Sequence, residues 1–115
     1  MAPDLVRVVI FRPGSSPETT TLASTLEAMR EVVGGNLGGL KIAPSIYLHF
    51  DDEGRVLGKP TCAFVDPLGD VVVGTCFAVG VDDAGEPRSL DDGEIAAVMK
   101  IVTPAAFVAP GRFQA

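Results

Sequence analysis

The side chain best suited to acid–base or nucleophilic chemistry is His49, the only histidine in the chain. A Ser-His-Asp or Cys-His catalytic device would have to use it, because imidazole is the base in both. Tyr47 shares its face of the predicted strand, since side chains two residues apart point the same way. The sequence offers no second member of such a device at a recognisable spacing. We therefore interpret His49 as a surface or interface residue.

A glycine-rich stretch at residues 34–39 offers a second kind of chemistry. Bare backbone amides in such a stretch can bind an anion. However, it follows a predicted helix rather than leading into one, and it lacks the Lys-Ser/Thr ending of a phosphate-binding loop. We interpret it as a helix cap followed by a turn. The alternative is a small-ligand pocket formed with residues of two strands: Gly35, Asn36, Gly38, Tyr47, His49 and Thr75.

Cysteines and carboxylates complete the reactive side chains. Cys62 and Cys76 do not match the spacing of a zinc site, so we predict two small buried hydrophobic side chains, no metal and no cofactor. Carboxylates cluster in predicted turns and at a predicted helix start: residues 51–53, Asp66 with Asp70, residues 82–83, and Asp91, Asp92 and Glu94. A pair from two turns could act as acid and base. The other interpretation is solvated turns and helix N-caps.

The composition limits the class of protein. The chain has 115 residues, a length that fits one domain, which we assign to residues 1–104 with a C-terminal tail at 105–115. The formal net charge of −6 argues against nucleic-acid and membrane partners, because both need a basic surface. No apolar run approaches the roughly 20 residues of a membrane helix. The N-terminus lacks a secretory signal, so we expect a cytoplasmic protein.

Four segments have the composition of β-strands. Turn residues or a proline interrupt them, and β-branched side chains dominate the first and the last. Pro44 marks an edge, a bulge or a break, after which Ile46, Leu48 and Phe50 alternate with polar residues and should face inward. Residues 71–81 form the longest apolar run and the expected inner strand, in which Gly74 marks a bulge or a close neighbour. The four segments are residues 5–11, 18–22, 40–50 and 71–81; residues 57–63 are expected to be irregular.

Two segments have the signals of amphipathic helices. The first spans residues 24–33, with a Ser24–Glu27 capping box, an apolar stripe that includes Leu26, and Gly34 as a left-handed C-cap. The second begins within residues 89–92, with two carboxylates near its positive end, and Pro104 ends it. Its apolar stripe is expected to consist of Ile95, Val98, Met99 and Val102. The order of elements predicts an α+β two-layer sandwich: a mostly antiparallel sheet of about four strands with two helices on one face.

Three segments of the chain resemble a known family. They are residues 25–35, which end in Val-Val-Gly-Gly, residues 52–60, which end in Gly-Lys-Pro, and residues 70–80, with Asp-Val-Val-Val-Gly-Thr. In this order and spacing they resemble a family of small uncharacterised proteins, a domain of unknown function found in phages, plasmids and bacterial genomes. The family has an Asn where this chain has Cys62, and a more strand-like sequence at residues 36–40. The resemblance implies a mobile-element or accessory context and no established activity.

These observations leave three functions open. The missing catalytic constellation favours a non-enzymatic binding or accessory protein, a homo-oligomer that associates through a sheet edge or through its apolar tail (residues 105–110 with Phe113). The alternative is a protein that binds a small, nucleotide-like molecule in the pocket named above. The third is a hydrolase that uses His49.

Overall fold

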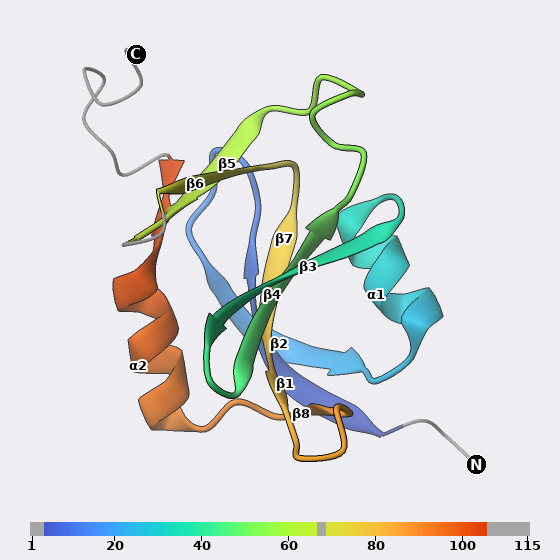
Figure 1. Cartoon of the computed structure of the whole chain (residues 1–115), viewed down its shortest axis with the longest axis vertical. Coiled ribbons are helices and arrows are strands. Elements are labelled where there is room, and N and C mark those ends of the chain that lie inside the picture. The colour runs from blue at the N-terminus through green and yellow to red at the C-terminus, as the bar shows by residue number, and fades with distance from the viewer. Residues whose placement is uncertain (1–3, 67–68, 106–115) are drawn as a thin grey trace.

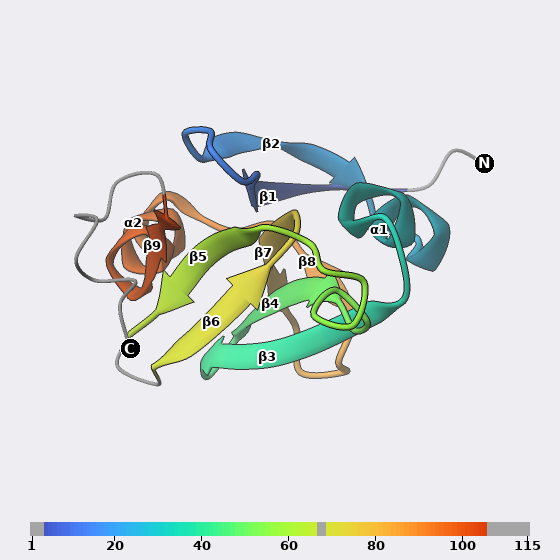
Figure 2. The ribbon, with the colours of Figure 1, turned by 90° about the horizontal axis from the view of Figure 1, so that it is seen from above.

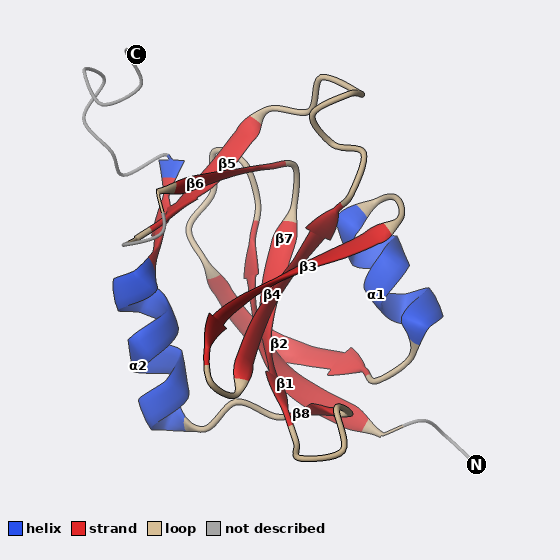
Figure 3. Ribbon diagram, in the orientation of Figure 1, coloured by secondary structure: helices blue, strands red, loops and turns tan. Residues whose placement is uncertain are grey.

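The computed structural model describes residues 4–66 and 69–105, which form nine strands and two helices (Figures 1 and 3). The helices are α1 (Leu26–Val33) and α2 (Asp92–Ile101). The strands are β1 (Leu5–Phe11), β2 (Glu18–Ala23), β3 (Leu37–Ala43), β4 (Ile46–Asp51), β5 (Thr61–Val65), β6 (Asp70–Val73), β7 (Cys76–Val81), β8 (Pro87–Arg88) and β9 (Val102–Pro104).

The strands form two antiparallel sheets. The main sheet has the order β2-β1-β7-β4-β3, and the short β8 pairs with the part of β7 that lies beyond its pairing with β1. Strand β7 is central because its side chains are apolar and buried on both faces. The small sheet has the order β6-β5-β9. Strands β6 and β7 are consecutive in the chain but belong to different sheets.

The main sheet is covered on both faces. Phe77 and Val79 of β7 pack with Met29 and Val33 of α1 on one face. The intervening residues of β7 point to the other face, where Ala78 joins a core that includes the small sheet and α2. Accordingly, α1 and α2 lie on opposite sides of the molecule (Figure 2).

The α+β class, the two helices and the mostly antiparallel pairing are confirmed, whereas the two-layer arrangement and the count of about four strands are wrong. The helices cover opposite faces because the central strands are apolar on both sides. The apolar stripe of a helix therefore predicts that the helix packs on the sheet, but it does not predict which face it covers. The predicted strand at 71–81 is two strands, since Gly74 has a φ of 73° and turns the chain between the sheets.

The prediction also missed the short strands β8 and β9 and the separate strand β5, and it placed the start of β3 too late. Residues 61–65 form β5, although Pro60 led to the expectation of irregular structure there. The glycines Gly38 and Gly39 lie within β3 rather than in a loop. Pairing with β4 overrides their low strand propensity, since β3 matches β4 residue by residue from Leu37 opposite Asp51 to Lys41 opposite Tyr47, before a bulge shifts the register.

The N-cap of helix α1 is one residue later than predicted. Thr25, not Ser24, is the N-cap, and its Oγ1 accepts a hydrogen bond from the Ala28 amide at 3.1 Å. The Ser24 amide, which the predicted capping box would direct to the Glu27 carboxylate, donates instead to the Asp4 carbonyl at 2.8 Å. Leu26 is 53 % exposed and does not belong to the buried stripe. Gly34 is confirmed as the left-handed C-cap, with a φ of 74°.

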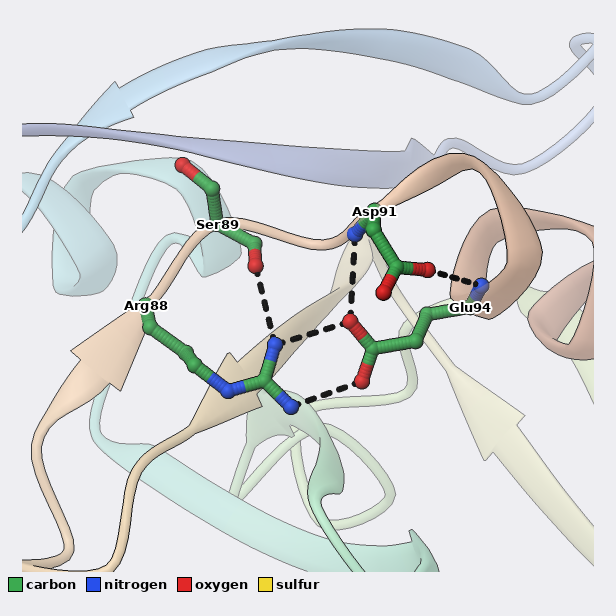
Figure 4. Close-up of polar contacts among 4 residues, drawn as sticks. All are labelled: Arg88, Ser89, Asp91 and Glu94. Carbon is green, nitrogen blue, oxygen red and sulfur yellow. Dashed lines mark hydrogen bonds and ion pairs between the residues drawn. The ribbon is translucent and has the colours of Figure 1, made fainter.

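Hydrogen bonds and an ion pair stabilise the first turn of helix α2, as drawn in Figure 4. Asp91 is the N-cap and forms a capping box with Glu94. Arg88 donates hydrogen bonds from both terminal nitrogens to the Glu94 carboxylate, at 2.8 and 2.7 Å. This hydrogen-bonded guanidinium lowers the pKa of Glu94 to about 2, so the carboxylate stays ionised under all but strongly acidic conditions. The predicted carboxylates at this helix start are therefore structural.

Within residues 4–66 and 69–105, no helix is long and apolar enough to cross a membrane.

Candidate functional site

An ion pair between a buried carboxylate and a partly exposed lysine joins the C-terminal end of α1 to β4. Lys59, in the loop before β5, places its Nζ 2.6 Å from Oδ2 of Asp51, the last residue of β4. The same ammonium donates to the Val33 carbonyl at 3.1 Å and to the Gly34 carbonyl at 3.3 Å. A cation at this end of a helix also interacts favourably with the helix dipole. We call Asp51, Lys59 and the carbonyls of Val33 and Gly34 the junction.

The Asp51 side chain is only 1 % exposed, and its neighbours stabilise its negative charge. The contact with Lys59, followed by the hydrogen bond from the Glu53 amide to Oδ1 at 3.0 Å, lowers the pKa of Asp51. Gly35 lies against the same carboxylate, and a Cβ at that position would come within 2.6 Å of its oxygens. Glycine is therefore required at position 35 by close approach rather than by backbone angle.

The three segments that carry the family resemblance meet at the junction. Residues 25–35 supply the end of α1, and residues 52–60 supply Lys59. Residues 70–80 supply Gly74, where a Cβ would lie 2.8 Å from Cδ of Lys59. The three segments therefore contact one another at the junction, which indicates a structural role for them. The ion pair also leaves neither Asp51 nor Lys59 as an unpartnered charge.

Beside the junction is a groove of about 260 Å³ between the β3–β4 hairpin and β6. Figure 2 shows β6 facing these two strands. Apolar side chains of all three strands line it, among them Leu40, Phe50 and Val72. We call this cavity the inter-sheet groove.

The polar lining of the inter-sheet groove comes from the turn after β4 and from two strand ends, Asp51 of β4 and Asp70 of β6. Asp52 and Asp70 are exposed, and Arg55 donates from Nη2 to the Val71 carbonyl at 2.6 Å. Arg55 thereby covers part of the open edge of β6, which pairs only with β5 among the described strands. The sequence signal for this site was a pair of carboxylate clusters, Asp51–Glu53 and Asp66 with Asp70. Asp51 and Asp52 of the first cluster and Asp70 of the second line the groove.

Three of the predicted site residues form one cluster on the α1 face of the sheet. His49 stacks on Tyr47, with ring centroids 6.2 Å apart, and its ring lies 5.3 Å from that of Phe77. Nδ1 of His49 is 3.1 Å from the Gly38 carbonyl. Burial lowers the pKa of His49, and the contact with Gly38 only partly opposes this. The imidazole is therefore uncharged at neutral pH.

The other predicted site residues lie elsewhere. Gly35 is at the junction, and the Asn36 side chain donates to the Glu53 carboxylate at 2.9 Å. Thr75 is half-buried in the link between β6 and β7. The lining of the inter-sheet groove includes none of the six residues of the predicted pocket. Three of its members, Asp51, Asp52 and Asp70, belong to the carboxylate clusters noted in the sequence. The sequence did not point to the others as site residues: Gly39, Leu40, Phe50, Arg55, Val71, Val72 and Val73.

Both cysteines are buried, as predicted. In the part of the chain that the structure describes, no three His, Cys, Asp or Glu side chains gather in a way that could hold a metal ion.

Comparison with known proteins supports the resemblance. No protein with a curated description and no solved structure matches the chain. The sequence profile of one family matches residues 6–103, a range that includes the junction and the inter-sheet groove. This protein therefore belongs to the family described as Domain of unknown function (DUF3846).

Proposed function

We propose that the protein is a non-catalytic binding protein that takes a small ligand in the inter-sheet groove. The observation that carries the proposal is the groove itself: an apolar cavity of about 260 Å³ with charged groups at its rim, lying where two sheets diverge. Ligand sites are typically concave, mainly apolar and equipped with a few polar groups. This volume lies just below the usual range of about 300–1,000 Å³, so the ligand should be small.

The charges of the groove favour a cationic ligand. Asp51 is neutralised by Lys59, which leaves Asp52 and Asp70 against Arg55 and hence an excess of negative charge. Arg55 is already engaged with the Val71 carbonyl. A ligand with an apolar body and an ammonium group would place the body on Leu40 and Phe50 and the ammonium near the carboxylates. A phosphate would meet repulsion there, so an amine fits better than a nucleotide.

Non-catalytic binding is supported by the state of the reactive side chains. His49 is flanked by Tyr47 and Phe77, and its Nδ1 is directed to a backbone carbonyl. Cys62 and Cys76 are buried. None of these three side chains lines the inter-sheet groove, so a ligand held there would not contact them.

The proposal predicts that small amines raise the melting temperature. A ligand at about 100 times its Kd stabilises the native state by about 2.7 kcal/mol, which corresponds to a rise in Tm of roughly 10 °C for a domain of this size. Thermal-shift measurements with spermidine, tyramine and AMP at millimolar concentration test this. We expect a rise with an amine and none with AMP.

The matched variants are Asp52→Asn/Asp70→Asn, which removes the rim carboxylates, and Asp83→Asn, which removes an exposed carboxylate in the β7–β8 turn. The double variant should lose the amine response and the Asp83→Asn variant should keep it. No shift with any amine, or an equal shift in the double variant, would contradict the proposal.

Self-association through a sheet edge is a second candidate, favoured by the form of β2. This outer strand pairs with β1 in unbroken register from Glu18 to Ala23, and Glu18 is its only charged residue. Natural edges are usually protected by charges, prolines or bulges. Two copies paired antiparallel about Thr20 and Thr21 would set Glu18 of each copy opposite Ala23 of the other, so like charges would not meet.

Light scattering tests this pairing. We expect a dimer for the natural chain, a monomer for Thr21→Lys, and a dimer for Ala96→Lys, which adds the same charge on the exposed side of α2. A monomeric natural chain would rule it out. The predicted tail interface concerns residues 105–115, of which only Ala105 lies within the described residues. An accessory role in a mobile element is compatible with either mode of binding.

A further inference from the structure

The two cysteines of the chain come together across the boundary between the sheets. Cys62 lies in β5 of the small sheet and Cys76 begins β7 of the main sheet. Cys62 Sγ donates to the Phe11 carbonyl at 3.2 Å, and Phe11 is directly opposite Cys76 in the pairing of β1 with β7. Both side chains belong to the same core cluster. Since opposite residues in an antiparallel pair have Cα atoms roughly 4.5–5.5 Å apart, the Cys62 sulfur reaches the immediate surroundings of Cys76.

We infer that Cys62 and Cys76 are a redox modification site, at which a low-molecular-weight disulfide such as oxidised glutathione converts the two thiols into an internal disulfide. The bond would join the small sheet to the main sheet and close a loop that contains β6, one wall of the inter-sheet groove. The inference does not depend on what the groove binds.

The reaction proceeds in two balanced exchange steps. The Cys62 thiolate attacks one sulfur of the small disulfide, forms a mixed disulfide and releases one thiol. The Cys76 thiolate then attacks the Cys62 sulfur and releases the second thiol. The protein loses two electrons and two protons, and the small disulfide gains them. Cys62 is suited to the first step, because its hydrogen bond with Cys76 lowers the pKa of the Cys62 thiol and raises that of Cys76.

Burial sets the rate of this reaction. Cys62 is 1 % exposed and Cys76 is 0 % exposed, so an external disulfide reaches them only when the small sheet opens from the main sheet. Oxidation should therefore be slow in buffer and faster in urea below the unfolding midpoint.

The test uses the full chain incubated with oxidised glutathione, with and without such urea. We expect loss of both free thiols without a change in molecular size. Cleavage at Asp66 and Asp70, which lie between the cysteines, should yield peptides that separate only after reduction. After removal of urea, the oxidised protein should melt roughly 10 °C higher, since a loop of about 15 residues is closed, and reduction should reverse the shift.

The single variants Cys62→Ser and Cys76→Ser should show no such shift; Cys62→Ala and Cys76→Ala replace them if a buried hydroxyl prevents folding. Free thiols that persist in urea, glutathione adducts or linked dimers without an internal bond, or an oxidised product that melts no higher than the reduced one would each overturn the inference.

Discussion

Replacing Lys59 with alanine is expected to lower Tm by at least about 10 °C. The Asp51 carboxylate, which is 1 % exposed in the natural chain, loses its cation in this variant, and the last carbonyls of α1 lose a donor. Removing one partner of such an ion pair is costly, because the remaining carboxylate loses its counter-ion and keeps only backbone hydrogen bonds such as that from the Glu53 amide. Thermal unfolding followed by circular dichroism measures the effect.

The matched control is Lys41→Ala. Lys41 is an exposed lysine of β3, and its removal should change Tm little. Equal losses in the two variants would contradict the role of the junction.

The loss of Tm caused by Lys59→Ala should depend on pH. The folded protein holds the pKa of Asp51 below its ordinary value of 3.8. The stability contributed by the ionised carboxylate is therefore present above pH 3.8 and is lost as the pH falls through the lower pKa of the folded state. Protonation of Asp51 removes the ion pair from the natural chain, so the difference in Tm between it and Lys59→Ala should shrink in strong acid.

A double variant separates charge from packing. Lys59→Met keeps most of the side-chain stem but leaves Asp51 unpaired, and adding Asp51→Asn removes the buried charge. We expect the double variant to be more stable than Lys59→Met alone, because the two residues interact directly. Strictly additive losses would show that the ion pair does not account for the effect.

The second large effect is expected at Phe77. Its side chain is fully buried in the central strand β7 and packs with α1 and with the His49 ring. Phe77→Ala should cost about 3–5 kcal/mol, from lost transfer of the ring and from the cavity left between the sheet and α1. Denaturant unfolding measures this loss as a lower midpoint with little change in slope.

Val56→Ala is the comparison for Phe77→Ala. Val56 is 87 % exposed in the loop before β5, so its truncation should shift the midpoint little. A similarly small loss for Phe77→Ala would mean that the core on the α1 face is loosely packed and able to collapse around the gap.

Local patterns in the sequence were sufficient for much of the fold. The alternation of Ile46, Leu48 and Phe50 predicts the facing of β4, and Gly34 predicts the end of α1. These features could be predicted because strand alternation and helix capping involve neighbours within a few residues. The same locality explains the errors: adjacent Ser24 and Thr25 both fit a cap, and only contacts with Asp4 and Ala28 distinguish them.

The candidate sites depend on residues far apart in the chain. Lys59 meets Asp51 and the end of α1 only because β4 ends beside that helix, and residues 57–63 carried no local signal of order. The carboxylates at 52 and 70 share a groove only because Gly74 sends β6 and β7 into different sheets. The sequence by itself determined the class, the family and most local elements, since those follow from short-range patterns. The tertiary structure alone decided which faces the helices cover and which side chains meet, including Cys62 with Cys76, because long-range strand pairing sets those contacts.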